Sequence, residues 1–364
     1  MKKKFATVFN NFEDVHLTKD VGMIPCSFSS LDNYEKSIIF YWDKEKEKEK
    51  IELQDVILHP IKAKTRLFYY FKLFQDISKN NVSVLNIYHE SIQSALFCYL
   101  AKLIGIKVYL KLDISHIGCD ILLKRSKSKR VIDYFRLKGI NLASFVSVET
   151  WDTFNKLKDN RVFKKDILYH IPNSILDSTV KADPLPYLER SNRIIVVGRI
   201  GAYQKNHELI LDALSEIESL KDWFVDFVGP IDDSFHEKID SFYKNNKRHS
   251  KVVRFLGNKS RDELMDLYAT SKIFLLSSRW EGFSLALVEA AYFGCYIITT
   301  EVGGSSEVTD RGKYGKIYKQ DELVDILSHI DDSYISSGYT DRLKYARDIF
   351  NINKYSGFIS KSLG

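Results

Sequence analysis

Two groups of residues in the C-terminal half have types and spacing that suit chemistry on a charged ligand. The first is Gly198-Arg199, which follows a β-branched run, and Lys205, which directly precedes an amphipathic stretch. Arginine offers a bidentate fork and lysine a mobile point charge, and together they suit a diphosphate on which charge grows. Alone this pattern is weak, because a Gly-Arg after a strand is more often a turn with a surface charge.

The second group lies between an apolar run and another amphipathic stretch: Glu281, Gly282, Phe283 and Ser284, with Glu289 inside the stretch. A helix opening near Ser284 would offer free N–H groups and a positive dipole end to an anion. Gly282 would let the backbone approach a ligand closely. Because the neighbours of Glu289 are apolar on nearly every side, we expect a buried carboxylate that needs partners, such as the two hydroxyls of a ribose.

The elements that must position these residues follow a βαβ pattern, in which short β-branched runs alternate with longer amphipathic ones. Strands are expected at 82–88, 107–113, 145–149, 193–199, 223–229, 252–257, 273–278 and 295–304. Helices are expected at 91–105, 207–220, 261–271 and 284–294. In doubly wound parallel sheets ligands lie beyond the carboxyl ends of the strands, where both groups fall.

The length of 364 residues predicts two domains, with 45% hydrophobic and 28% charged residues as in ordinary globular proteins. We expect an N-terminal domain over 1–185 and a C-terminal domain over 186–340, joined by a linker at 183–193. The alternating charges of 44–50 suit an exposed loop or strand edge.

The order of these motifs carries a resemblance to a family. VVGRIGAYQKN, DFVGP, EGFSLALVEA and TTEVGGSSEV, with Glu281 and Glu289 as an E-x7-E pair, resemble family 4 of the retaining glycosyltransferases, which have the GT-B fold. The resemblance covers about 190–315 well and the N-terminal half more loosely, through TKDVGMIPCSF around Gly22, KLDISH ending in His116, and HIPNSILD, in which Ser174 replaces the usual glycine.

That resemblance implies a fold of two facing Rossmann-like domains with a cleft between them, and a role for each matching residue. Arg199 and Lys205 would bind the diphosphate of a nucleotide-sugar donor, and Glu289 the ribose. Glu281, with the backbone of 282–284, would hold the transferred sugar. His116 would approach the sugar from the acceptor side, near Gly22. Residues 341–364 would form helices crossing back onto the N-terminal domain.

The resemblance further implies a retaining transfer that needs no metal or other cofactor, from a UDP-sugar or, as second choice, a GDP-sugar. The acceptor would be a glycan or a lipid-linked glycan of bacterial surface polysaccharide or glycoconjugate synthesis. The carboxylate pairs Asp232-Asp233 and Asp331-Asp332 are expected to lie in polar loops, since neither has further ligands at metal spacing.

Composition adds expectations about location and partners. Four scattered cysteines without CxxC spacing, and no leader or membrane-length apolar run, favour the cytoplasm. Residues 1–190 hold 31 Lys and Arg against 23 Asp and Glu, a net charge of +8. A basic run contributes much of it and is read either as a solvated surface or as a patch docking on the anionic inner face of a membrane: Lys124, Arg125, Lys127, Lys129 and Arg130. Nucleic acid is not expected, because no groove-reading motif accompanies the charge.

Three rival functions keep the same fold. One is a non-catalytic glycosyltransferase-like subunit that binds glycan or stabilises a partner. Such a subunit would usually lack one of the donor-binding residues, and this chain has all four: Arg199, Lys205, Glu281 and Glu289. An epimerase is disfavoured by the E-x7-E context, and a glycan phosphorylase by the chain length.

Overall fold

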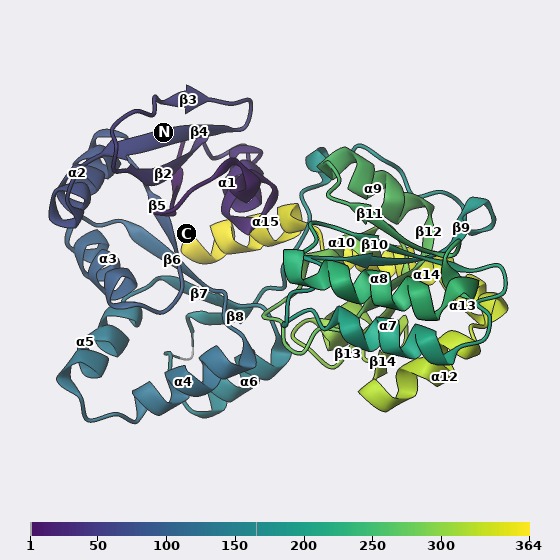
Figure 1. The fold of residues 1–364 in the computed structure, drawn as a ribbon. Helices are drawn as coiled ribbons and strands as arrows, with labels where there is room; N and C mark the ends of the chain where they lie inside the picture. Colours follow the sequence, from purple (N-terminus) through teal and green to yellow (C-terminus); the bar gives the residue numbers. More distant parts are fainter. Residues whose placement is uncertain (1, 165) are drawn as a thin grey trace. The chain divides into compact units, whose positions relative to one another are not determined.

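A computed structural model describes residues 2–164 and 166–364 of the chain. It divides into two compact units, Met1–Leu176 with Asn351–Gly364, and Asp177–Phe350 (Figure 1). Each unit is built on one mainly parallel sheet flanked by helices. No helix in the described ranges is long and apolar enough to span a bilayer.

The N-terminal unit holds an eight-stranded sheet in the order β3-β4-β2-β1-β5-β6-β7-β8, parallel except for the short edge strand β3. Its strands are β1 (Phe5–Val8), β2 (Ser37–Asp43), β3 (Ile51–Glu52), β4 (Val56–Lys62), β5 (Val84–Tyr88), β6 (Lys107–Leu112), β7 (Phe145–Val148) and β8 (Leu168–His170). Its α-helices are α1 (Asp20–Ser29), α2 (Arg66–Lys79), α3 (Ile92–Leu103), α4 (His116–Ser126), α5 (Val131–Ile140), α6 (Trp151–Asp159) and α15 (Ile352–Leu363).

The C-terminal unit holds a six-stranded, wholly parallel sheet in the order β11-β10-β9-β12-β13-β14. Its strands are β9 (Ser191–Val197), β10 (Phe224–Val228), β11 (Val253–Gly257), β12 (Ser271–Leu276), β13 (Tyr296–Thr300) and β14 (Gly315–Tyr318). Its α-helices are α7 (His207–Glu216), α8 (His236–Asn245), α9 (Arg261–Thr270), α10 (Leu285–Tyr292), α11 (Ser305–Val308), α12 (Leu323–Ser328), α13 (Asp332–Ser337) and α14 (Tyr339–Ile349).

The central strands explain why apolar runs predicted the sheets so well. Ile194, Ile195 and Val196 of β9 are all buried, as are Ile273, Phe274 and Leu275 of β12, because helices cover both faces of a parallel sheet. Both predictions, of two doubly wound α/β domains and of a GT-B fold, are confirmed.

The units divide at 176/177 and 350/351 rather than at the expected 185/186 and 340/341. Of the helices expected to cross back at 341–364, only α15 belongs to the N-terminal unit, where it packs against α1 (Figure 1). The preceding helix, α14, stays in the C-terminal unit because Arg342 is buried there and donates to the carbonyl of Gly294 at 3.1 Å.

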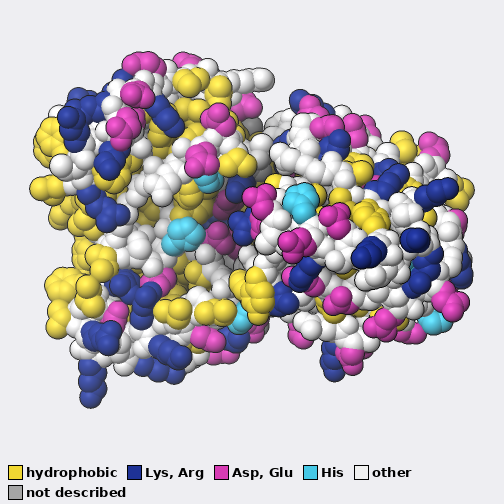
Figure 2. Space-filling model, in the orientation of Figure 1, with side chains coloured by type: hydrophobic (Ala, Val, Ile, Leu, Met, Phe, Trp, Pro, Cys, Tyr) yellow, Lys and Arg dark blue, Asp and Glu magenta, His cyan; other side chains and the backbone are white. Residues whose placement is uncertain are grey.

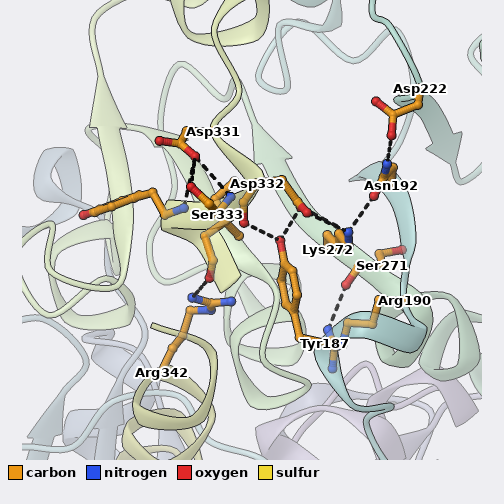
Figure 3. Close-up of polar contacts among 12 residues, drawn as sticks. Tyr187, Arg190, Asn192, Asp222, Ser271, Lys272, Asp331, Asp332, Ser333 and Arg342 are labelled. Carbon is orange, nitrogen blue, oxygen red and sulfur yellow. Dashed lines mark hydrogen bonds and ion pairs between the residues drawn. The ribbon is translucent and has the colours of Figure 1, made fainter. Parts of the chain in front are cut away.

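The residues expected to form a linker at 183–193 are packed structure. Arg190 is 4% exposed and donates to the carbonyl of Ser271 at 2.8 Å, so the chain is held against the start of β12 (Figure 3). β9 itself begins within the expected linker, at Ser191.

The pair Asp331-Asp332, expected in a polar loop, forms the start of a helix and a partly exposed ion pair (Figure 3). Asp331 caps the N-terminus of α13, where its side chain accepts hydrogen bonds from the N–H groups of Ser333 and Tyr334. Asp332 accepts from Lys272 at 3.1 Å and from the hydroxyl of Tyr187 at 2.6 Å. This network joins the amino ends of β9 and β12 to the start of α13, at the opposite end of these strands from their carboxyl ends.

Candidate functional site

The carboxyl ends of β9, β12 and β13 carry the residues that the sequence singles out. Because these strands are adjacent and parallel, their ends meet at one edge of the sheet. Two glycines let the loops there touch through their backbones. A Cβ on Gly303 would lie 1.8 Å from the carbonyl oxygen of Gly282, and one on Gly229 would lie 1.9 Å from that of Gly198. The loops after the strands therefore form one packed layer.

Glu281 and Lys205 meet within this layer. The Nζ atom of Lys205 lies 2.7 Å from Oε1 of Glu281, and the Ser278 hydroxyl donates to the same oxygen at 2.7 Å. Gln204 donates to the other carboxylate oxygen at 3.2 Å. The structure thus joins two predicted donor-binding residues. The Lys205 side chain runs beside Gly198, 3.4 to 3.6 Å from where a Cβ of Gly198 would stand.

The start of α10 lies directly beyond this ion pair. Ser284 occupies the N-cap position, and its side chain makes no capping hydrogen bond, which leaves first-turn N–H groups without that partner. Phe283 is 5% exposed and packs its ring over Gly304, at 3.0 to 3.1 Å from where a Cβ would stand. Because its side chain is buried, Phe283 contributes only backbone groups to the site.

Glu289 is largely buried, as expected, but its partner in the structure is a cation. Nη1 of Arg261, the first residue of α9, lies 2.7 Å from its Oε1, and the Glu289 side chain is 12% exposed. A reciprocal capping box between Ser260 and Glu263 starts α9 at that point and so places Arg261. Nε and Nη2 of Arg261 are buried without a hydrogen-bond partner in the structure. Sequence reasoning missed Arg261, although the S-x-x-E cap beside it is visible in the sequence.

Arg199 stands apart from these pairs. Its side chain is 66% exposed, and Nε lies 3.4 Å from Oδ1 of Asp232 in the loop after β10. The ion pairs of the described residues do not link it to Lys205 or Glu281. Asp232, expected in a polar loop, is therefore the acidic side chain that pairs with Arg199.

The N-terminal unit places the two acceptor-side residues differently from each other. His116 is exposed as the first residue of α4, behind the N-cap Ser115. Gly22, expected on the acceptor side, is buried in the first turn of α1. A Cβ there would lie 2.3 Å from the carbonyl oxygen of Leu17, so only glycine allows the helix to start so close to the preceding turn.

A buried polar cluster in the same unit was not foreseen. Lys111, near the end of β6, pairs with Glu149 after β7, lies 3.3 Å from Asp20 and donates to Asn173 at 3.0 Å. Burial opposes the charge of Lys111, but the carboxylates of Glu149 and Asp20 outweigh it and raise the pKa of its ammonium group. Burial raises the pKa of Glu149, and the neighbouring Lys111 opposes that rise. The cluster joins the carboxyl ends of three strands to α1.

Among the described residues, no group of three or more His, Cys, Asp or Glu side chains is arranged to hold a metal ion. At the carboxyl ends of the strands in the C-terminal unit, the charged groups form cation–carboxylate pairs beside the N-terminus of α10.

Comparisons with known proteins fit this arrangement. Residues 180–347 match the family model described as glycosyl transferases group 1. The gpi3 subunit of phosphatidylinositol N-acetylglucosaminyltransferase from Schizosaccharomyces pombe is 28% identical over 171 residues, which are 45% of this chain and 36% of that protein. This chain therefore spans about a third of that relative's length. An uncharacterized glycosyltransferase of Methanocaldococcus jannaschii is 26% identical over 78% of this chain and 76% of its own.

Solved structures match over the whole chain. Sucrose-phosphate synthase from Thermosynechococcus elongatus has a TM-score of 0.71 at 14% identity, covering 100% of this chain and 99% of that one. HepE from Anabaena, solved in complex with UDP, gives the same TM-score, identity and coverage. Residues 180–347 thus match the glycosyl transferases of group 1, within a chain that has the GT-B fold.

Proposed function

We propose that this protein is a retaining glycosyltransferase that moves a sugar from a nucleotide-diphosphate sugar to a glycan or lipid-linked glycan. A UDP-sugar is the favoured donor and a GDP-sugar the second choice. The observation that carries the proposal is the grouping of Lys205, Glu281 and the start of α10 at one sheet edge, with Glu289 close behind. The match of residues 180–347 and the UDP complex of HepE support it.

The leaving group is a nucleoside diphosphate, on which negative charge grows as the bond to the sugar breaks. Lys205 and Arg199 would bind its phosphates, and the N–H groups of α10 would face the same charge. We propose that these groups supply the stabilisation, so that transfer needs neither a metal nor another cofactor. Glu281, already held by three donors, would present its carboxylate and the backbone of 282–284 to the sugar hydroxyls.

In the retaining transfer that we propose, the bond from the acceptor oxygen to the anomeric carbon forms on the face from which the diphosphate leaves. The acceptor proton passes to an oxygen of the departing β-phosphate. Glu289 would accept hydrogen bonds from the ribose hydroxyls while Arg261, 2.7 Å away, holds that carboxylate in place.

The acceptor side is proposed to lie in the N-terminal unit, at His116 and the start of α1, which contains Gly22. We further propose a role in bacterial surface polysaccharide or glycoconjugate synthesis at the cytoplasmic face of the membrane. Lys124, Lys127, Lys129 and Arg130 would contribute attraction to that surface. Arg125, counted with them on sequence grounds, pairs with Glu90 and is partly buried.

The test combines binding, transfer and stereochemistry. Thermal unfolding with UDP, GDP and ADP identifies the base, since a ligand at 100 times its Kd stabilises the fold by about 2.7 kcal/mol. Transfer is then assayed with and without EDTA, and proton NMR of the fresh product reads its anomeric configuration. An inverted linkage, or transfer abolished by EDTA, would refute the mechanism. Nucleotide binding without transfer or donor hydrolysis would instead identify a non-catalytic subunit.

A further inference from the structure

The outward face of α5 is apolar and exposed. Val131 is 72% exposed, Ile132 52%, Tyr134 59% and Phe135 59%. At helical spacing these four side chains share one face of the first turns of α5, and we call this face the α5 surface. Ile117 and Ile121, one turn apart on the neighbouring α4, are also exposed. Figure 2 shows hydrophobic side chains gathered over this part of the N-terminal unit, with lysines and arginines beside them.

The opposite face of α5 holds the helix in this orientation. Asp133 points inward and pairs with Arg136 at 3.3 Å, and Ile140 is fully buried. A Cβ on Gly139 would lie 2.5 Å from that of Ala95, so α5 packs directly on the backbone of α3. The helix cannot rotate its apolar face inward without unpacking these contacts.

Basic side chains border the α5 surface. Lys124, Lys127, Lys129 and Arg130 are all exposed in the segment that leads into the helix. Lys138 extends back over the ring of Tyr134 at 5.7 Å. The acidic residues between 116 and 140 are Asp120, exposed on α4, and Asp133, which faces inward. Cations therefore outnumber exposed carboxylates along the border of the apolar face.

We propose that the α5 surface inserts its apolar side chains into the interfacial region of an anionic bilayer while these cations contact the lipid head groups. Apolar anchors bordered by lysine and arginine are the composition of an interfacial helix. A second copy of this chain is a poorer occupant, because it would bring two sets of cations face to face. The inference deepens the proposed function, which needs the protein close to a lipid-linked acceptor, by adding an apolar insertion to the electrostatic attraction.

Vesicle sedimentation of the full chain tests binding, in phosphatidylcholine alone and with phosphatidylglycerol added. We expect binding to require the anionic lipid. Ile132→Ser with Phe135→Ser should lower the partition coefficient at least tenfold, and neutralising Lys124, Lys127, Lys129 and Arg130 should lower it about fivefold per charge. Leu188→Ser is the matched control, since Leu188 is 89% exposed in the C-terminal unit and should change nothing.

Insertion is read separately by tryptophan fluorescence. Phe135→Trp should be quenched by brominated anionic lipid beyond the wild-type signal, whereas Leu188→Trp should not. Equal binding to neutral vesicles, no added quenching at position 135, or an equal loss in Leu188→Ser would overturn the proposal. So would a dimer in sedimentation velocity that the two serine substitutions abolish. No nucleotide or acceptor is present in these assays, so their failure would leave the proposed transfer standing, and absence of transfer would leave membrane insertion standing.

Discussion

Lys205 and Arg199 have the same proposed ligand but different surroundings. Lys205 is 20% exposed and bound to Glu281, whereas Arg199 is 66% exposed and only loosely paired with Asp232. A substitution at Arg199 therefore probes ligand binding alone. A substitution at Lys205 also leaves a buried carboxylate without its cation, which has a cost of its own.

We expect Arg199→Ala and Lys205→Ala each to lower kcat/KM about 10- to 100-fold, which is about 1.5 to 3 kcal/mol of lost hydrogen bonding to a charged group. Only Lys205→Ala should also lower the free energy of unfolding. Steady-state kinetics and urea titration measure the two effects. Lys313→Ala is the control, because Lys313 is exposed and pairs only loosely, at 4.0 Å, with Asp310. A silent but folded Arg199→Ala would remove the diphosphate assignment.

Arg261 is expected to act through Glu289, as a positioning residue. Arg261→Met leaves that carboxylate without its cation, so UDP affinity should fall about tenfold, within the range of one charge-assisted hydrogen bond. Glu289→Gln should weaken binding too, and the double variant should lose less than the sum, because the two side chains are in contact. Calorimetric titration of UDP measures this coupling. Lys259→Met, which breaks the exposed pair with Glu263 on the same helix start, should bind UDP normally; a strictly additive cycle would contradict the positioning role.

At the scale of elements, the site depends on how closely the loops after β12 and β13 pack. Gly303 lies against both Gly282 and Glu281, with their carbonyl oxygens 1.8 and 2.7 Å from where its Cβ would stand. These distances lie below any real Cβ contact, so the backbone must move to accept a side chain. The loop carrying Glu281 would move with it, while the β-strands beneath need not.

Gly303→Ala should therefore abolish or strongly weaken UDP binding while the protein stays folded. The physical reason is displacement of the Glu281 loop from Lys205 and from the start of α10. UDP titration and circular dichroism separate binding from folding. Gly357→Ala, at a position in α15 with no atom within 4 Å of the added Cβ, is the matched control. Unchanged UDP affinity in Gly303→Ala would show that this loop does not form the donor site.

At the scale of the whole molecule, each unit contains a histidine that is neutral in the folded chain. Burial lowers the pKa of His207 to about 4, with the charge of Lys205 adding to the effect. Its Nδ1 accepts the N–H of Gly201 at 3.2 Å, which requires the neutral ring. In the N-terminal unit burial lowers the pKa of His170, also to about 4, where the ring stacks on Trp151 at 4.0 Å.

Both histidines therefore make stability depend on pH in the same direction. An unfolded histidine takes up its proton near pH 6.5, so between about pH 6.5 and 4 the unfolded chain binds more protons than the folded one. Stability is complete above that window and is lost as pH falls through it, by about 2 to 3 kcal/mol for His207, which is 2% exposed. Calorimetry at pH 7.5 and 4.5 measures the loss. His207→Gln should shrink it, and an undiminished loss would mean that His207 does not titrate in this way.

The sequence by itself determined the two doubly wound domains, most strand positions and the sheet edge that carries the site. It could do so because period-2 and period-3.6 apolar patterns, and the order of motifs along the chain, are local properties. Glu289 could likewise be predicted to be buried from its apolar neighbours alone.

Only the tertiary structure decided which side chains meet. Arg261 reaches Glu289 across 28 residues of sequence and Lys111 reaches Glu149 across 38, because strand order and helix start points bring them together. Arg125, a member of the basic run, forms an ion pair with Glu90, and Gly22 lies in a helix. Gly139 of α5 packs against Ala95 of α3, and this contact sets the rotation of α5. That rotation leaves the apolar side chains of Val131, Ile132, Tyr134 and Phe135 exposed. Pairings of this kind depend on packing between distant segments, and no local pattern encodes them.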